Sequence, residues 1–321
     1  MSRWSGRRAA ARVVVAAVAW LFPVPAGAQA LPFHTDTGIT TGFQENAGRG
    51  FVSLLGREGL LVDGDEAEDP ARRELDAFAI VGGAIPLTFT PLWTARVVVP
   101  FVHKSLAFDG PIGERLEFDT GGLGDVLVDT KWIFYSDNRP QASTRLGLQA
   151  GIKIPTGETD ERLPGSEVAP RPLQVGTGAW DVPVELVLTD TEGRWGFHGN
   201  VGWRFNFEDD GFEAGDVFKY DAALGLRFLP WVYKSLRDQT LVAYLELNGE
   251  VAREDEIVGE ENADSGGHLL FVSPDLQWIP TPWLLFEASV QIPVVQDLNG
   301  AQLEHETRFQ LGGRFRFSTA P

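Results

Sequence analysis

The feature that most constrains this chain is a strict alternation of apolar and polar residues, which recurs in long segments. In residues 144–154, Leu146 and Leu148 share one parity, whereas Arg145 and Gln149 share the other. A repeat of two is the period of a β-strand whose two faces meet different environments. Globular strands usually run about 5–6 residues, but these run about 10–13, as tilted strands that cross a bilayer do.

About twelve such segments are predicted between residue 51 and the C-terminus. They lie at residues 51–62, 74–85, 93–104, 125–135, 144–154, 180–190, 195–205, 216–228, 241–252, 267–279, 284–293 and 304–317. An even number of strands is typical of single-chain bacterial barrels. We therefore expect an all-β fold, a transmembrane antiparallel up-and-down β-barrel of about twelve strands.

The connections between these segments alternate in length and charge. Those after even-numbered segments are mostly short, as at residues 136–142 and 280–282. Those after odd-numbered segments are long and mostly acidic, and one carries six carboxylates between Glu254 and Asp264. Since transmembrane barrels have short periplasmic turns and longer extracellular loops, both chain ends are expected on the periplasmic side. The acidic loops either form a solvated rim, which we favour, or bind divalent cations shared with lipopolysaccharide phosphates.

The N-terminus carries an export signal. Arginines precede an apolar run from Val13 to Phe22, and small residues follow at Ala26, Ala28 and Ala30. This order is typical of a cleaved signal peptide. The apolar run is shorter than the ~20 residues of a membrane-spanning helix, so we expect cleavage rather than anchoring.

These signals divide the chain into four parts. We expect a signal peptide at residues 1–30, the barrel at 51–317 and a short tail at 318–321. Residues 31–50 form either a flexible periplasmic lead, which we favour, or a small plug in the lumen.

The last segment ends with an assembly signal. Gln310 and Gly312 precede two aromatic residues of the same parity, Phe315 and Phe317. This pattern is similar to the C-terminal signal by which outer-membrane barrels are handed to the barrel-assembly machinery. We expect that machinery, outer-membrane lipid and lipopolysaccharide to be partners of the chain.

The charged parity of each strand is expected to face the lumen, because a Lys or Arg facing lipid near the midplane costs ~2–4 kcal/mol. The candidate lumen-lining residues are Arg96, Lys104, Asp129, Lys131, Arg145, Gln149, Lys153, Asp181, Glu185, Arg204, Lys219, Asp221, Arg227, Glu246, Glu250, Asp275, Glu287, Arg308 and Arg314. Either they line a conduit whose charges select solutes, or they pair with one another and fill the bore. Twelve strands fall between barrels filled by side chains and barrels with a water channel, so both alternatives stay open.

Aromatic residues gather at the strand ends beside the short turns. They are Trp93, Tyr135, Trp195, Trp231, Tyr233, Trp278 and Trp283. Amphipathic rings prefer the membrane interface, so this distribution favours a periplasmic girdle.

Composition and spacing argue against several function classes. The net charge of −18 argues against nucleic-acid binding, and the absence of Cys excludes disulfides and thiolate metal sites. We find no histidine spacing for a metal and no cofactor motif. His198 and Asn200 share the lumen parity, but no serine stands near them in a nucleophile context. We therefore expect a protein that is not an enzyme and holds no cofactor or metal.

Four short blocks follow one another in an order that resembles a known family. They are Gly124–Lys131, Gly151–Gly157, Gly176–Asp181 and Gly199–Trp203. The chain resembles, from about residue 75 onward, the outer-membrane barrels associated with the meta-pathway of phenol degradation. The resemblance implies a channel or transporter, with aromatic compounds among its solutes, and it supplies no set of binding residues.

The function expected from these observations is passive passage of a small-molecule solute through the bacterial outer membrane. Hydrophobic or aromatic compounds are the solutes that the resemblance adds. Two alternatives remain: a structural or adhesive barrel without transport, and a barrel enzyme that acts on lipids.

Overall fold

The computed structural model describes residues 30–40, 45–83, 87–110, 112–163, 168–235 and 237–318. Apart from residues 30 and 318, the expected signal peptide and tail lie outside the described residues. Within the described part, no helix is long and apolar enough to cross a membrane.

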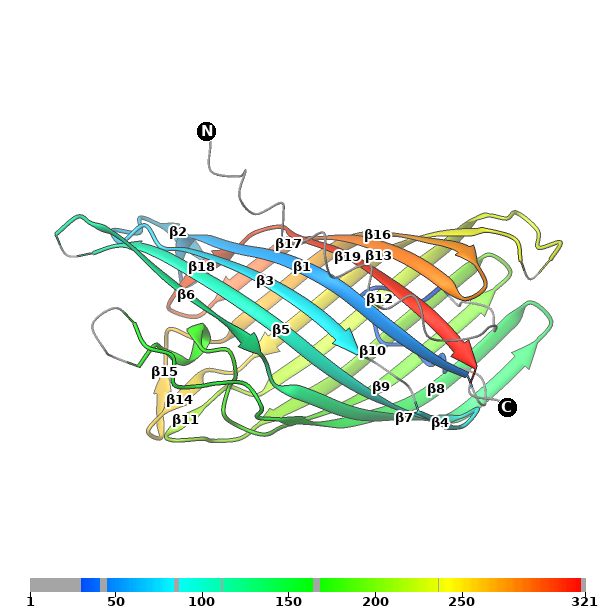
Figure 1. Cartoon of the computed structure of the whole chain (residues 1–321), viewed down its shortest axis with the longest axis horizontal. Helices are drawn as coiled ribbons and strands as arrows, with labels where there is room; N and C mark the ends of the chain where they lie inside the picture. Colours follow the sequence, from blue (N-terminus) through cyan, green and yellow to red (C-terminus); the bar gives the residue numbers. More distant parts are fainter. Residues whose placement is uncertain are drawn as a thin grey trace.

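Twelve antiparallel strands form the wall of one closed barrel (Figure 1). In chain order they are β1 (Glu45–Val62), β3 (Glu74–Gly83), β5 (Trp93–Asp109), β7 (Val126–Arg139), β8 (Ala142–Ile154), β9 (Asp181–Glu192), β10 (Trp195–Asn206), β12 (Val217–Leu229), β13 (Thr240–Ala252), β16 (Gly267–Thr281), β17 (Leu284–Leu298) and β19 (Arg308–Ser318). Each pairs with the next along the chain, and β1 closes the ring by pairing with both β19 and β3. The predicted fold class and strand number are confirmed.

Short elements extend the wall at the long-loop end. They are β2 (Asp65–Ala67), β6 (Arg115–Leu123) and β18 (Ala301–His305), while β4 (Leu87–Thr90) pairs with β5 at the other end. A separate three-stranded sheet joins β11 (Phe212–Glu213), β14 (Asp255–Ile257) and β15 (Glu260–Asn262) from two of the long loops. One 3₁₀ turn, η2 (Arg171–Leu173), lies in the loop between β8 and β9.

The two faces of the wall differ as the alternation predicts. On β8 the outward side chains of Leu148 and Ile152 are exposed, whereas Gln149 is buried in the lumen. The seven aromatics at the short-turn end are 41–69 % exposed, although they are among the largest apolar side chains of the protein. An outer surface of this kind suits lipid rather than water.

The first strand begins earlier than predicted. β1 starts at Glu45 instead of residue 51 and already pairs with β19 there. Its outward positions in this stretch include Gly48 and Gly50, so the apolar alternation is missing from the sequence. The outer face is covered from the neighbouring strand instead, because the Phe315 ring occupies the space that a Cβ on Gly48 would need.

The last predicted strand, 304–317, is two strands. β18 ends at His305 and β19 begins at Arg308, and the register of β1 against β18 shifts between Arg57 and Leu60. Gly59 lies within that shift with a φ of 81°, a conformation that glycine adopts without strain. The interruption turns Glu306 toward Gly56, on the outward parity of β1.

Candidate functional site

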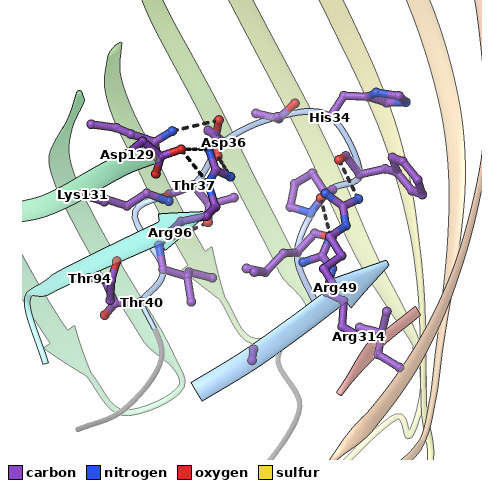
Figure 2. A pocket seen from close by; sticks show the side chains of 18 of the residues that line it. His34, Asp36, Thr37, Thr40, Arg49, Thr94, Arg96, Asp129, Lys131 and Arg314 are labelled. Carbon is purple, nitrogen blue, oxygen red and sulfur yellow. Dashed lines mark hydrogen bonds and ion pairs between the residues drawn. The ribbon is translucent and has the colours of Figure 1, made fainter. Parts of the chain in front are cut away.

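Residues 30–40 lie inside the barrel and cross its lumen (Figure 1, dark blue; Figure 2). We call them the plug segment. Of the two alternatives for this region, the favoured periplasmic lead is wrong for residues 30–40. The physical reason is that lumen side chains satisfy the backbone of this irregular segment, as buried polar groups require.

Glu246 of β13 forms the centre of this attachment. Its side chain is fully buried and accepts hydrogen bonds from the backbone N–H groups of Phe33 at 2.6 Å, His34 at 3.2 Å and Thr35 at 2.7 Å. The Thr35 hydroxyl donates to it as well, at 2.6 Å. Successive N–H groups that converge on one anion form a nest, and here the anion belongs to the wall.

Glu287 of β17 organises a second attachment. It pairs with Arg49 at 2.7 Å and with Arg314 at 2.8 Å. Arg49 donates to the Phe33 carbonyl at 2.9 Å, and Arg314 donates to the Pro32 carbonyl at 3.1 Å. One buried carboxylate thus orients two arginines toward the backbone of the plug segment.

A third group holds Asp36 (Figure 2). Arg96 of β5 bridges Asp36 at 3.3 Å and Asp129 at 2.8 Å, and Gln149 donates to Asp36 at 3.3 Å. The Asp36 backbone N–H donates to Asn200 of β10 at 3.0 Å. Burial would raise the pKa of Asp36, but the nearby positive charges, Arg96 first, outweigh it and hold that pKa below its ordinary value.

Neutral side chains bind the ends of the plug segment. The Gln277 amide of β16 both accepts from the Leu31 N–H and donates to its carbonyl. Further along, the Gly38 N–H donates to the Thr189 hydroxyl of β9 at 2.9 Å. The plug segment is therefore attached to opposite sides of the wall, mainly by polar contacts.

A cavity of about 220 Å³ remains between the plug segment and one side of the wall. We call it the turn-side cavity, because it lies at the end of the barrel that carries the short turns. Its wall residues are Ala47, Gly48, Arg49, Thr94, Arg96, Asp129, Lys131, Gln149, Leu285, Arg314 and Arg316. In Figure 2 the side chains of Arg96 and Lys131 stand on one side of it and those of Arg49 and Arg314 on the other.

At the other end of the barrel, the loop between β8 and β9 folds against the lumen. Lys104 of β5 donates to the carbonyls of Pro172, at 2.8 Å, and Gln174. The Gln174 side chain is 1 % exposed and bonds to the backbone of Glu161 and Ala169 within the same loop. We call residues 155–163 and 168–180 the mouth loop.

The predicted lumen residues divide into three groups by their contacts. Five bond to the plug segment, namely Arg96, Lys131, Gln149, Glu246 and Arg314. Asp129 and Glu287 pair with arginines of that group, and Asp275 lies next to Glu246.

The residues of a second group form ion pairs or ring contacts with other wall residues and, in the described structure, do not contact the plug segment. Lys153 pairs with Asp181, and Lys219 pairs with Asp221 at 3.1 Å. Arg308 packs over the Phe271 ring, with its guanidinium carbon 4.5 Å from the centroid.

The remaining residues lie across the wall or near its ends. Glu185 stands opposite Gln149 in the β8–β9 register, and Glu250 stands opposite Lys219 in the β12–β13 register. Arg145 and Arg227 lie toward the short turns, where Arg227 covers the Tyr233 ring at 4.1 Å, and Arg204 is exposed toward the long loops.

Several residues of the site carry no signal in the alternation or charge pattern of the sequence. Arg49 precedes residue 51, where the first strand is predicted to begin. Asp36 lies outside any segment with a periodic pattern. Gln277 and Thr189 stand on the lumen parity of predicted strands but carry no charge. The missing signal was hydrogen-bonding capacity on the lumen face, which charge alone does not report.

The four assembly-signal residues lie on both faces of β19. Phe315 and Phe317 stack on the outer face with ring centroids 5.8 Å apart. Gln310 is buried in the lumen, where its side chain donates to the Ser53 hydroxyl at 3.3 Å, and Gly312 stands against Phe51.

His198 is inside the lumen and 2 % exposed. Its Nδ1 lies 2.9 Å from the Thr189 hydroxyl, and its ring packs 6.0 Å from that of Tyr244. In the part of the chain that the structure describes, no group of three or more His, Cys, Asp or Glu is arranged to hold a metal ion.

Comparison with known proteins identifies the family. The model of the family described as "Putative MetA-pathway of phenol degradation" matches residues 74–295, more than half of the chain. The chain belongs to this family. The resemblance seen in the four sequence blocks is thereby confirmed. No curated protein matches the sequence significantly.

Solved structures share the fold at low identity. An outer membrane channel from Pseudomonas putida F1 is 13 % identical, with a TM-score of 0.67 over 90 % of this chain and 100 % of that one. The transport unit of the autotransporter AIDA-I from Escherichia coli is 12 % identical, with a TM-score of 0.46 over 84 % and 90 % of the two chains. The similarity to the channel from Pseudomonas putida F1 supports the barrel fold of this chain.

Proposed function

We propose that this chain is an outer-membrane channel for passive passage of small solutes, with hydrophobic or aromatic compounds among them. The observation that carries the proposal is the contrast between an apolar outer face and a polar lumen that is crossed by a segment held through side-chain contacts. A barrel that served only as structure would gain more from an apolar core, because buried ion pairs stabilise less than packed hydrocarbon.

In the conformation described, the plug segment occupies the lumen, so passage requires that it move. Polar contacts of this kind can be exchanged for contacts with water, and only the plug segment itself has to shift. The proposal includes export by a cleaved signal peptide, insertion by the barrel-assembly machinery, and lipopolysaccharide around the rim. The family name and the channel from Pseudomonas putida F1 support the same class of function.

The test is ion conductance and solute flux in reconstituted bilayers. The mature chain is compared with a variant that lacks residues 30–40. We expect low conductance for the mature chain and a stable, larger conductance for the deletion variant. If the deletion variant is folded, as heat-modifiable migration reports, yet remains electrically silent and passes no solute, the channel function is wrong and a structural barrel is favoured.

A lipid-acting enzyme is the weaker alternative. His198 faces the lumen rather than the lipid, and its ring nitrogen contacts Thr189. Phospholipid hydrolysis that disappears in His198→Ala would favour this alternative over transport.

A further inference from the structure

Three polar side chains of the turn-side cavity form a row along one wall. Thr94 of β5 stands opposite Lys131 of β7, and Lys131 stands opposite Gln149 of β8. All three line the cavity, and Figure 2 shows Thr94 and Lys131 on the same side of it. Directly opposed residues on one face of a sheet have Cβ atoms about 5 Å apart. One small polar group can therefore reach two neighbours of the row at once.

Gln149 contributes an acceptor that has no donor. Its Nε2 donates to the Asp36 carboxylate at 3.3 Å, and because a carboxylate only accepts, this contact fixes the orientation of the amide. The amide oxygen, Oε1, is buried and has no hydrogen-bond partner among the described residues. A buried acceptor without a donor is unfavourable. The cavity therefore favours a ligand that donates at this point.

Lys131 and Thr94 contribute hydrogen-bonding capacity beside it. The Lys131 ammonium donates to the Thr37 carbonyl at 2.6 Å, and in the part of the chain that the structure describes it forms no ion pair within 4.0 Å. An ammonium group has three N–H donors, so it has capacity for a further acceptor. The carbonyl of Thr94 accepts a hydrogen bond from Thr130, but its hydroxyl forms none with the residues described. A hydroxyl can donate or accept.

The arginines of the lining do not require a charged ligand. Arg96 pairs with Asp36 at 3.3 Å. Arg49 and Arg314 both pair with Glu287, at 2.7 Å and 2.8 Å. These charges are offset within the protein, so a neutral ligand suits the cavity.

A hydroxyl group matches the row. It has one O–H donor and two acceptor lone pairs, so a single oxygen atom can donate to Gln149 and accept from Lys131. A carboxylate or an ether oxygen could not donate to Gln149, and an ammonium group could not accept from Lys131. The donors and acceptors of the row thus select a neutral hydroxyl over these other groups.

The rest of the cavity offers hydrocarbon. Its apolar lining includes Leu31, Pro32, Ile39, Ala47 and Leu285. A cavity of about 150 Å³ is large enough to hold benzene, and this one measures about 220 Å³. The space therefore suits one six-membered ring together with one small polar group.

We propose that the turn-side cavity binds a neutral alcohol, a hydroxyl group carried on a hydrocarbon body of single-ring size. The hydroxyl would lie against Thr94, Lys131 and Gln149, and the ring against the apolar lining. The inference rests on the proposed channel function and names the class of solute that the channel recognises.

The test is isothermal titration of the mature full-length chain in an uncharged detergent, corrected for each ligand in detergent alone. Cyclohexanol is compared with fluorocyclohexane, which keeps the ring but has no O–H, and with ethanol, which keeps the hydroxyl on a smaller body. We expect cyclohexanol to bind at least about fivefold more tightly than either, because fluorocyclohexane leaves the Gln149 acceptor unpaired and ethanol buries less hydrocarbon.

Phenol and fluorobenzene form the aromatic pair of the same test. Tighter binding of both alcohols than of their fluorinated partners supports recognition of hydroxyl and ring size, and tighter binding of phenol alone supports the same site for aromatic alcohols. If neither alcohol binds, or if each binds no better than its fluorinated partner or ethanol, the proposal is wrong.

Two variants locate the site. Thr94→Val keeps the shape of the side chain without its hydroxyl and is expected to weaken cyclohexanol binding about threefold to tenfold. Thr120→Val is the matched control, because the Thr120 hydroxyl is also buried without a partner in the described structure but lies outside the cavity. It should bind cyclohexanol as the unmodified chain does. If Thr94→Val does not give a heat-modifiable barrel, Lys131→Met takes its place. Unchanged affinity in the folded cavity variant would show that the alcohol binds elsewhere.

The outcomes separate this inference from the proposed function. Alcohol binding by a barrel that stays silent after plug deletion supports the site and refutes the channel. Conductance without alcohol binding supports the channel and refutes the site.

Discussion

Glu246 of β13 accepts a hydrogen bond of 2.6 Å from the backbone N–H of Phe33, although 213 residues separate them in the chain. Two neighbouring N–H groups converge on the same carboxylate. Nothing else in the described structure gathers three consecutive backbone donors of the plug segment, so the docking of that segment depends strongly on one buried side chain.

Glu246→Ala is therefore expected to release the plug segment. The substitution leaves the N–H groups of residues 33–35 without their acceptor, and each buried, unpaired donor costs about 1–3 kcal/mol. A single such loss shifts the ratio of docked to released plug about tenfold. We expect longer and more frequent openings in single-channel recordings.

Glu250→Ala is the matched control for Glu246→Ala. Glu250 lies on the same strand and the same lumen parity but does not bond to the plug segment in the described structure. Openings that increase equally in both variants would show that lumen charge, and not the contact with the plug segment, controls the channel.

The wall of the barrel could be predicted from the sequence, because the alternation that marks each strand lies within that strand. In β8, β10 and β13 the lipid face carries an apolar residue at most of the alternate positions, and the predicted boundaries differ from the observed ones by at most two residues. The predicted start of the first strand is wrong, because there the outer face of β1 is formed by a side chain of another strand. Gly48 is covered by the Phe315 ring from β19, so β1 lacks apolar alternation at its start.

The plug segment could not be predicted, because the residues that hold it are far from it in the sequence. Residues 31–40 have no period, and their backbone is held by Gln277, Glu246, Asn200 and Thr189, each more than 150 residues away. The lumen parity of these four residues could be predicted, but their partner could not. A polar lumen is equally compatible with water, with cross-strand pairs and with a plug.

His34 should make the plug segment sensitive to acid. Burial lowers its pKa to about 4, from an ordinary value of 6.5. Of the charges that face it, Glu246 opposes this shift, while Arg49, Lys219 and Arg308 add to it. A released plug segment would expose His34 to water and restore the ordinary value.

The sign of the effect follows from the two pKa values. Between pH 4 and pH 6.5 the released form binds more protons, so docking weakens as the pH falls through this window and is fully favoured above it. The shift amounts to roughly a hundredfold in the docked-to-released ratio. Asp36, whose pKa is lowered, loses its contribution only below about pH 4.

We therefore expect the open probability to rise on acidification from pH 7 to pH 4.5. His34→Gln keeps a donor near Ser289, which His34 contacts at 2.9 Å, but does not titrate. It should flatten the pH response. An identical response in His34→Gln would assign the titration to groups of the wall.

Lys104→Met should free the mouth loop. Lys104 holds two loop carbonyls, and hydrogen bonds to a charged group contribute about 1.5–3 kcal/mol. Methionine keeps the length of the side chain but cannot donate. We expect faster cleavage within residues 155–163 by a protease added outside intact cells. Lys104→Arg, which keeps the charge and the donors, should stay protected, and equal protection of Lys104→Met would contradict this role.

Removal of residues 317–321 should impair assembly in cells more than it impairs stability. Phe317 stands opposite Asn46 at the very end of the β1–β19 pairing, so its loss removes few of the contacts that close the ring. A chain without it should still refold in detergent and show heat-modifiable migration. In cells, by contrast, the loss of the final aromatic should lower the amount of folded barrel in the outer-membrane fraction.

A shorter truncation, of residues 318–321, keeps Phe317 and should reach normal levels. If both truncations reach normal levels, the C-terminal aromatic is not the assembly signal; if the longer one fails to refold in detergent as well, its role is closure of the barrel.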